Sequence, residues 1–140
     1  MAETRSIPRE EALIFNEEHW PAHNLRQGID WKQSEHAFGA FEDGRLCGVA
    51  YYKVVGGMAY LEQIVVADGL TKRGLGSTLM KAFESHASEL GCHVIQLETA
   101  ETQAPGFYER LGYERIGTYS DGRFHLDWHL YRKEIPQAAR

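Results

Sequence analysis

A glycine-rich segment in the middle of the chain has the composition of an anion-binding turn. It reads TKRGLGS and comprises Thr71, Lys72, Arg73, Gly74, Leu75, Gly76 and Ser77. Because glycine has no Cβ, a bulky phosphate can approach the backbone closely at Gly74 and Gly76. Lys72, Arg73 and the Ser77 hydroxyl can add contacts. The segment predicts a phosphate cradle, and a turn whose glycines merely relieve strain remains the alternative.

The neighbouring elements put this segment at the start of a helix. A strand is predicted for residues 58–66, and the helix that follows has apolar residues at three- and four-residue intervals: Leu75, Leu79, Phe83, Ala87 and Leu90. Gly91 suits the position just past the helix end. The first N–H groups of a helix lack backbone partners, and its dipole favours an anion. Two named nucleotide motifs, GxxxxGK followed by Ser or Thr and GxGxxG, are absent.

The N-terminal part predicts one helix and a less regular stretch. The helix is expected to start near Pro8, which suits a first turn, and to be interrupted by Pro21. Its inward face is expected to carry Ala12, Leu13, Phe15 and Trp20. Residues 22–35 predict a short helix or a loop.

The rest of the chain predicts strands, so that the fold class is mixed α/β (α+β). Two strands flank the turn signal Asp43-Gly44, and a second turn at Gly56-Gly57 leads to the strand 58–66, which gives an antiparallel meander. After the predicted helix come a strand, a short helix and two strands, over residues 92–99, 105–112, 113–120 and 123–135.

The composition argues against several classes of protein. The 140 residues suit a single domain, 1–140. The net charge of −5 argues against a basic surface that binds nucleic acid. No stretch approaches the roughly 20 apolar residues of a membrane span, and the first residues lack the apolar region of a signal peptide. Cys47 and Cys92, without CxxC spacing, suit reduced thiols. We therefore expect a cytoplasmic protein without nucleic-acid or membrane partners.

A second motif lies about one helix and one strand downstream of the glycine segment. Residues 103–117 read QAPGFYERLGYERIG and fit the pattern A-x-x-F/L-Y-x-x-x-G-F/Y through Ala104, Phe107, Tyr108, Gly112 and Tyr113. Together with the strand-to-helix GxG segment, this motif resembles the GCN5-related N-acetyltransferase (GNAT) superfamily. The resemblance covers residues 36–134, including the order of the strands and the spacing of the two motifs.

The resemblance implies both a fold and a cosubstrate. A central mixed, mostly antiparallel sheet flanked by helices would have two parallel middle strands, 58–66 and 92–99, that splay apart around acetyl-CoA. Its pantetheine arm would bond to backbone near Ile64, Val65 and Val66, and its pyrophosphate would rest on the 71–77 segment. Two positions depart from the family pattern. Thr71 stands where Gln or Arg is usual, and Glu101 where Asn is frequent.

The implied reaction moves an acetyl group from a thioester to an amine and needs two proton transfers. The amine must lose a proton before it attacks, and the departing thiolate must gain one. By resemblance, Tyr108 is the general acid that protonates the departing thiolate, and a core tyrosine with a satisfied hydroxyl is the alternative. Glu62 is the candidate base, acting through a water, because strand alternation puts it with Ile64 and Val66. Glu98 is its rival, and either carboxylate could instead be solvated or ion-paired. A backbone N–H of residues 64–66 would hold the oxyanion.

Other polar groups favour simpler interpretations. His125, Asp127, His129 and Tyr131 alternate along the last predicted strand and favour a half-exposed face over an acceptor wall or a metal site. Cys92 and His93, adjacent on a strand, would point to opposite faces and make a poor dyad. Four N-terminal residues are weaker candidates for contacts with the acceptor: Glu17, Glu18, His19 and Trp20. No metal is expected.

The sequence thus predicts an N-acetyltransferase that uses acetyl-CoA and a small-molecule primary amine, reacting directly in a ternary complex. A non-catalytic acyl-CoA sensor with the same fold is the alternative, because fold alone does not determine function. The identity of the amine stays open, as does the choice between Glu62, Glu98 and water as the base. The aromatic-rich last strand could support a homodimer.

Overall fold

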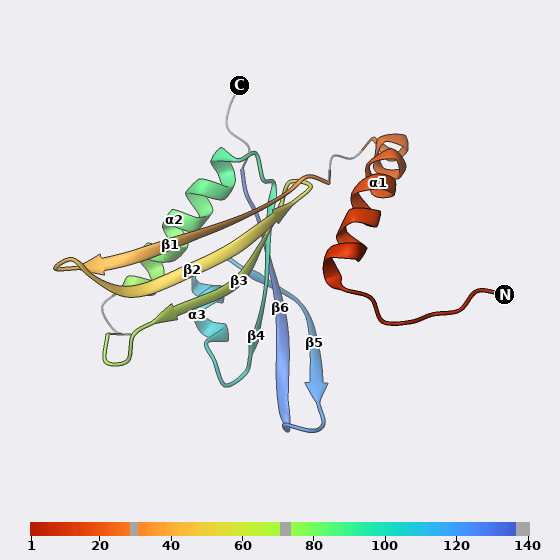
Figure 1. Cartoon of the computed structure of the whole chain (residues 1–140). Helices are drawn as coiled ribbons and strands as arrows, with labels where there is room; N and C mark the ends of the chain where they lie inside the picture. Colours follow the sequence, from red (N-terminus) through yellow and green to blue (C-terminus); the bar gives the residue numbers. More distant parts are fainter. Residues whose placement is uncertain (29–30, 71–73, 137–140) are drawn as a thin grey trace. The chain divides into compact units, whose positions relative to one another are not determined.

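The computed structural model describes residues 1–28, 31–70 and 74–136 (Figure 1). The chain divides into two compact units, residues 1–32 and 33–140, and each is described by itself. Thr71, Lys72 and Arg73 lie outside the described residues. The expectation of a single domain over residues 1–140 stays a prediction.

The first unit contains one helix, α1 (Arg9–Gln27). It starts directly after Pro8 and ends at Gly28, whose φ of 71° is the left-handed conformation that glycine adopts without steric cost. The expected interruption at Pro21 is wrong, since α1 continues through this residue. Proline has a helical φ, so a helix can pass through it by giving up one backbone hydrogen bond. Within the described residues, no helix is both long and apolar enough to cross a membrane.

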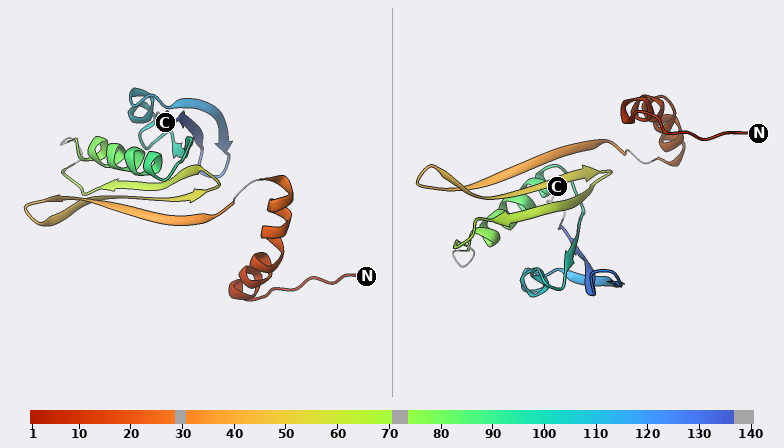
Figure 2. Two further views of the ribbon diagram at one scale, coloured as in Figure 1. Left: turned by 90° about the horizontal axis from the view of Figure 1, so that it is seen from above. Right: turned by 60° about the horizontal axis from the view of Figure 1, so that its bottom comes forward.

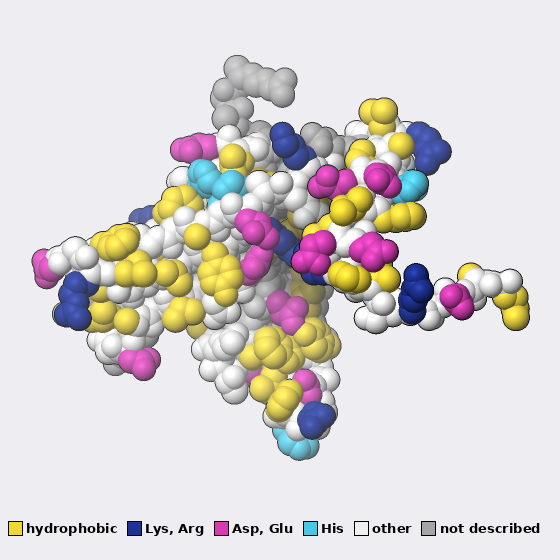
Figure 3. All heavy atoms as spheres, in the orientation of Figure 1, with side chains coloured by type: hydrophobic (Ala, Val, Ile, Leu, Met, Phe, Trp, Pro, Cys, Tyr) yellow, Lys and Arg dark blue, Asp and Glu magenta, His cyan; other side chains and the backbone are white. Residues whose placement is uncertain are grey.

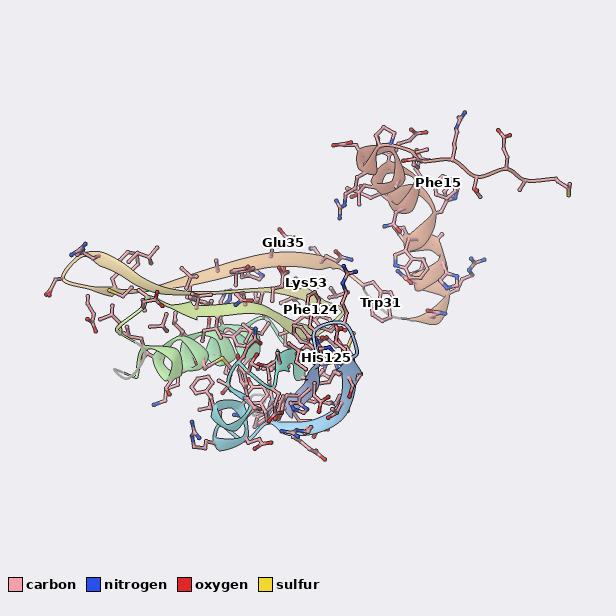
Figure 4. The ribbon with its side chains drawn as sticks, turned by 90° about the horizontal axis from the view of Figure 1, so that it is seen from below. Phe15, Trp31, Glu35, Lys53, Phe124 and His125 are labelled. Atoms are coloured by element: carbon pink, nitrogen blue, oxygen red, sulfur yellow. The ribbon has the colours of Figure 1, made fainter. Side chains whose placement is uncertain are left out.

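The expected inward face of α1 is also not buried. Leu13, Phe15 and Trp20 are all exposed, and Figure 4 labels Phe15 among the outward side chains of the helix. A lone helix has no second element within its own unit against which an apolar stripe can pack. The spacing of these residues was therefore insufficient to predict burial.

The second unit is a six-stranded sheet with two helices, in the strand order β1-β2-β3-β4-β6-β5. The elements are β1 (Gln33–Glu42), β2 (Arg45–Val55), β3 (Met58–Val66), α2 (Leu75–Glu89), β4 (Val94–Ala100), α3 (Pro105–Arg110), β5 (Glu114–Asp121) and β6 (Leu126–Glu134). Helix α2 packs against the β1–β3 part of the sheet, and α3 lies beside β4 and β6 (Figure 2). This mixed α/β architecture confirms the predicted fold class.

The first three strands form the predicted antiparallel meander. Asp43 and Gly44 both have positive φ, 50° and 76°, as a two-residue type I′ hairpin turn requires. Figure 4 labels one cross-strand pair of this hairpin, Glu35 on β1 and Lys53 on β2, which face each other in the register.

The parallel middle strands separate after a short contact. β3 pairs with β4 only from Met58, opposite Val94, to Tyr60, opposite Gln96. Beyond this point β4 stays paired with β6, as far as Ala100 opposite Trp128. β3 and β4 therefore diverge, as Figure 1 shows, and the predicted splay is confirmed.

Most of the predicted apolar stripe of α2 forms the core. Leu75, Leu79, Phe83 and Ala87 are buried in the main hydrophobic cluster. Leu90, predicted to join them, is 44% exposed. The helix ends at Glu89, and the ψ of 0° at Leu90 takes this residue out of the helical period. The prediction for Leu90 was therefore wrong.

The last strand differs from its prediction in two ways. It begins at Leu126, so His125 lies in the preceding turn with a φ of 54°, next to Phe124 at the end of the β5–β6 hairpin (Figure 4). The expected half-exposed polar face is wrong for His129 and Tyr131, which are 3% and 0% exposed. Sequence alternation identified their common face but not the burial of that face.

Candidate active site

A cavity of about 270 Å³ lies where β3 and β4 diverge. Four elements and the turn after β4 supply its lining: Leu61, Glu62, Gln63, Ile64, Val66, Gly76, Leu97, Glu98, Thr99, Gln103, Ala104, Phe107 and Tyr108. The splay thus creates the space, and the elements on both sides supply polar side chains to it.

Tyr108 contributes a protonated hydroxyl to this cavity. Its side chain extends from α3, packs against Phe107, Tyr113 and Tyr131, and is only 7% exposed. Burial raises the pKa of Tyr108 to about 12, because the phenolate is poorly solvated there. Within the described part of the chain, its hydroxyl has no hydrogen-bond partner. Tyr108 is therefore a buried, protonated tyrosine in the wall of the cavity.

Glu62 lies at an irregularity in β3. Leu61 pairs with Tyr52 and Gln63 pairs with Tyr51, so Glu62 is an extra residue between them. Such a β-bulge bends the strand and redirects side chains, and bulges are frequent next to active sites. Glu62 lines the cavity and is exposed.

The same bulge changes the alternation on which the sequence argument relied. Ala59 and Leu61 before the bulge belong to the core, and Ile64 and Val66 after it pack against that core. A regular strand would have separated the first two from the last two. The expectation that Glu62 shares a face with Ile64 and Val66 was therefore wrong, although all three line the cavity.

Glu98 lies across the cavity on β4 and has a defined partner. The Tyr119 hydroxyl on β5 donates a hydrogen bond to the Glu98 carboxylate, which raises the pKa of Tyr119. The Tyr119 ring stacks on Trp128 of β6 with centroids 6.4 Å apart. This arrangement holds one oxygen of Glu98 in place and leaves the other for a ligand.

Two features of the described residues bear on the expected binding of acetyl-CoA. Gly74 precedes α2 with a φ of 73°, no side chain caps this helix start, and its first turn carries no acidic residue. The N–H groups of a first helical turn lack backbone partners within the helix, which suits a phosphate. Beyond Tyr60, β3 has no partner strand on the β4 side, so its backbone at Ile64–Val66 can pair with an extended ligand. The start of α2 and the β3 backbone at Ile64–Val66 therefore fit the pyrophosphate and the pantetheine arm of acetyl-CoA.

The predicted site residues divide into two groups. Glu62, Glu98, Tyr108 and three binding candidates line one cavity, the three being Ile64, Val66 and Gly76. Val65 is exposed and Leu75 is buried in the core, and neither lines the cavity. Gly74, which directly precedes α2, and Ser77 do not line it either.

Gln103 is a cavity residue that the sequence analysis missed. Its amide oxygen accepts hydrogen bonds from the Thr99 hydroxyl at 3.0 Å and the Ala100 N–H at 2.9 Å. The amide is therefore anchored at one end while the side chain lines the cavity. Its place directly before Ala104 of the second motif was the only available signal.

Glu101, the second departure from the family pattern, has a structural partner. The nearly buried His129 on β6 hydrogen-bonds through Nε2 to the Glu101 carboxylate, and its Nδ1 lies 2.9 Å from the Thr118 hydroxyl. Glu101 therefore joins the turn after β4 to β6. Among the described residues, no group of three or more His, Cys, Asp or Glu side chains is arranged to hold a metal.

Known structures share this fold. An acetyltransferase from Bacillus cereus ATCC 14579 superposes with a TM-score of 0.81 at 21% identity, covering 96% of this chain and 98% of that one. The structure of nourseothricin acetyltransferase gives a TM-score of 0.66 at 26% identity, covering 73% and 66%. The fold is thus that of the acetyltransferases.

Sequence comparison assigns the family. The model of the acetyltransferase (GNAT) family matches residues 4–113. The blasticidin-S acetyltransferase of Streptomyces morookaense is 36% identical over 95 residues, which are 67% of this chain and 70% of that protein. The chain belongs to the GNAT family and is an N-acetyltransferase, as the two motifs predicted.

Proposed function

We propose that this enzyme transfers the acetyl group of acetyl-CoA to a primary amine of a small molecule, by direct attack in a ternary complex. The observation that carries the proposal is the cavity at the splay, which is lined by Glu62, Glu98 and Tyr108. Tyr108 is buried and protonated, and its hydroxyl has no partner among the described residues. Acetyl-CoA supplies the activated thioester when bound.

Tyr108 acts as the general acid. A group with a pKa of about 12 stays protonated at neutral pH and can give its proton to a thiolate leaving group. Its hydroxyl makes no hydrogen bond to the described residues that would have to break first.

Glu62 acts as the base, through a water. An alkylammonium has a pKa near 10, so it must lose a proton before its nitrogen can attack. Glu98 already accepts the Tyr119 hydroxyl, whereas the Glu62 carboxylate makes no hydrogen bond or ion pair with a described side chain. This difference favours Glu62 over Glu98 as the base.

A small-molecule acceptor is supported by two similar proteins whose names state their substrates. One is a blasticidin-S acetyltransferase and the other a nourseothricin acetyltransferase. The cavity of about 270 Å³ is close to the lower end, about 300 Å³, of the sizes of small-ligand sites.

The test measures CoA thiol release from acetyl-CoA with a panel of amines, for wild type, Tyr108→Phe and the control Tyr51→Phe. Tyr51 is an exposed tyrosine on β2 that does not line the cavity. We expect release with one class of amine, reduced about 10²-fold or more in Tyr108→Phe and unchanged in the control.

Two other results would change the proposal. If Tyr108→Phe releases CoA as fast as wild type, Tyr108 is not the general acid, but the protein is still an acetyltransferase. No release with any amine, in a protein that still binds acetyl-CoA, would favour the sensor alternative.

A further inference from the structure

We propose that the acceptor carries two cationic groups, and that Glu98 binds the one that is not acetylated. This inference rests on the proposed function and specifies the class of acceptor: a diamine or a larger polycation with a second ammonium or guanidinium group.

The charge of the cavity is the first argument. Two carboxylates line it, Glu62 and Glu98, and none of the described lining residues is Lys, Arg or His. Two negative charges around one small cavity repel each other and attract cations. An acceptor with a single ammonium compensates one carboxylate and loses that charge as it is acetylated.

The second argument is that the cavity is built for a ligand. Tyr108 is more than nine-tenths buried, its side chain lines the cavity, and its hydroxyl lacks a hydrogen-bond partner among the described residues. Buried polar groups are rarely left unpaired unless a ligand or water satisfies them. The carboxylates therefore face a site at which a reacting molecule is expected.

The third argument is the fixed orientation of Glu98. One carboxylate oxygen accepts the Tyr119 hydroxyl, and the Tyr119 ring stacks on Trp128. Holding the side chain in advance reduces the entropy that binding would otherwise cost. Among the described residues Glu62 has no such hydrogen-bond partner, which suits a group that must exchange protons with water.

The surroundings of Glu98 also suit a cation with an apolar body. In the register, Glu98 faces Leu130 and Ala100 faces Trp128, so these residues share one side of the sheet. Figure 3 shows hydrophobic side chains gathered over the β5–β6 hairpin. Aromatic faces attract cations, and the aliphatic part of a polyamine can lie on such a surface.

The experiment compares α,ω-diamines of three to eight carbons with amino alcohols of the same length, in which a hydroxyl replaces the second ammonium. For each pair the ratio of kcat/KM is measured with acetyl-CoA, and the ratio of dissociation constants is measured by calorimetry with CoA present. The variants are Glu98→Gln, Tyr119→Phe and the control Glu114→Gln, an exposed residue of β5 outside the cavity.

We expect wild type to prefer the diamine by at least about tenfold at one or two chain lengths. That preference should fall below about threefold in Glu98→Gln, fall partly in Tyr119→Phe and persist in Glu114→Gln. Because the readout is a ratio between two acceptors, a general loss of activity in a variant cancels.

The outcomes separate this inference from the proposed function. Equal turnover and binding of diamines and amino alcohols, or a preference that survives Glu98→Gln, overturns the inference while acetyl transfer stands. If no amine is acetylated, the proposed function fails, and the calorimetric ratio still decides the inference. Failure of every diamine to bind more tightly than its amino alcohol overturns it.

Discussion

The Nε2 atom of His129 is hydrogen-bonded to the carboxylate of Glu101, which connects the buried middle of β6 to the turn that follows β4. The backbone N–H of Glu101 also donates to the Asp127 carbonyl at 2.8 Å. This turn leads directly into α3 and Tyr108. The position of the proposed general acid therefore depends on a polar pair that lies outside the cavity.

Replacing Glu101 should destabilise the protein. Glu101→Ala leaves the nearly buried imidazole of His129 without its acceptor, so we expect the free energy of unfolding to fall by about 1–3 kcal/mol. Glu101→Gln retains an acceptor oxygen and should lose less. Urea denaturation of both variants measures the difference. Equal stabilities of wild type and Glu101→Ala would contradict a structural role for this pair.

Stability at alkaline pH should report the burial of Tyr108. Its folded pKa of about 12 exceeds the unfolded value near 10, so its contribution is complete below pH 10 and is lost as pH rises towards 12. Between about pH 8 and pH 11, wild type should lose on the order of 1 kcal/mol more stability than Tyr108→Phe. Denaturation curves of both proteins at the two pH values test this. Parallel losses would show that Tyr108 has an ordinary pKa.

The two glycines before and inside α2 should respond differently to alanine. Gly74 has a φ of 73°, so Gly74→Ala strains the backbone and should cost about 1 kcal/mol, although no atom lies within 4 Å of the new Cβ. At Gly76 the new methyl would lie 3.4 Å from the Phe107 ring, an ordinary contact. Gly76→Ala should therefore keep or raise stability by up to about 1 kcal/mol.

The same Gly76→Ala variant should impair the cosubstrate. Gly76 lines the cavity, and the added methyl occupies space in it. We expect the dissociation constant of acetyl-CoA to rise several-fold, as measured by calorimetry. Unchanged affinity in a stable variant would argue that acetyl-CoA does not approach this part of the wall.

Two leucines of the predicted α2 stripe should differ in their contribution to stability. Leu79 is 2% exposed, and Leu79→Ala should cost about 2–5 kcal/mol through lost burial and the cavity left behind. Leu90 is 44% exposed just past the helix, and Leu90→Ala should change stability by less than about 1 kcal/mol. Thermal or chemical denaturation compares them, and similar costs would contradict the helix end at Glu89.

Local patterns in the sequence predicted most of the second unit. Asp43-Gly44 predicted the first hairpin, because few residue pairs adopt positive φ in succession. The spacing of Leu75, Leu79 and Phe83 predicted the buried face of α2, because helical geometry places such residues together. In the N-terminal unit the same kind of argument was wrong, since burial of an apolar stripe needs a second surface.

Taken alone, the sequence determined the family and the identity of the proposed general acid. The GxG segment and the motif around Tyr108 carry that information in the spacing of a few residues, which does not depend on distant contacts. Only the tertiary structure showed what surrounds each carboxylate. The bulge at Glu62, the hydrogen bond from Tyr119 to Glu98 and the burial of His129 beside Glu101 all arise from contacts between separate elements of the chain. No local period encodes such pairings, because they form only when the sheet assembles.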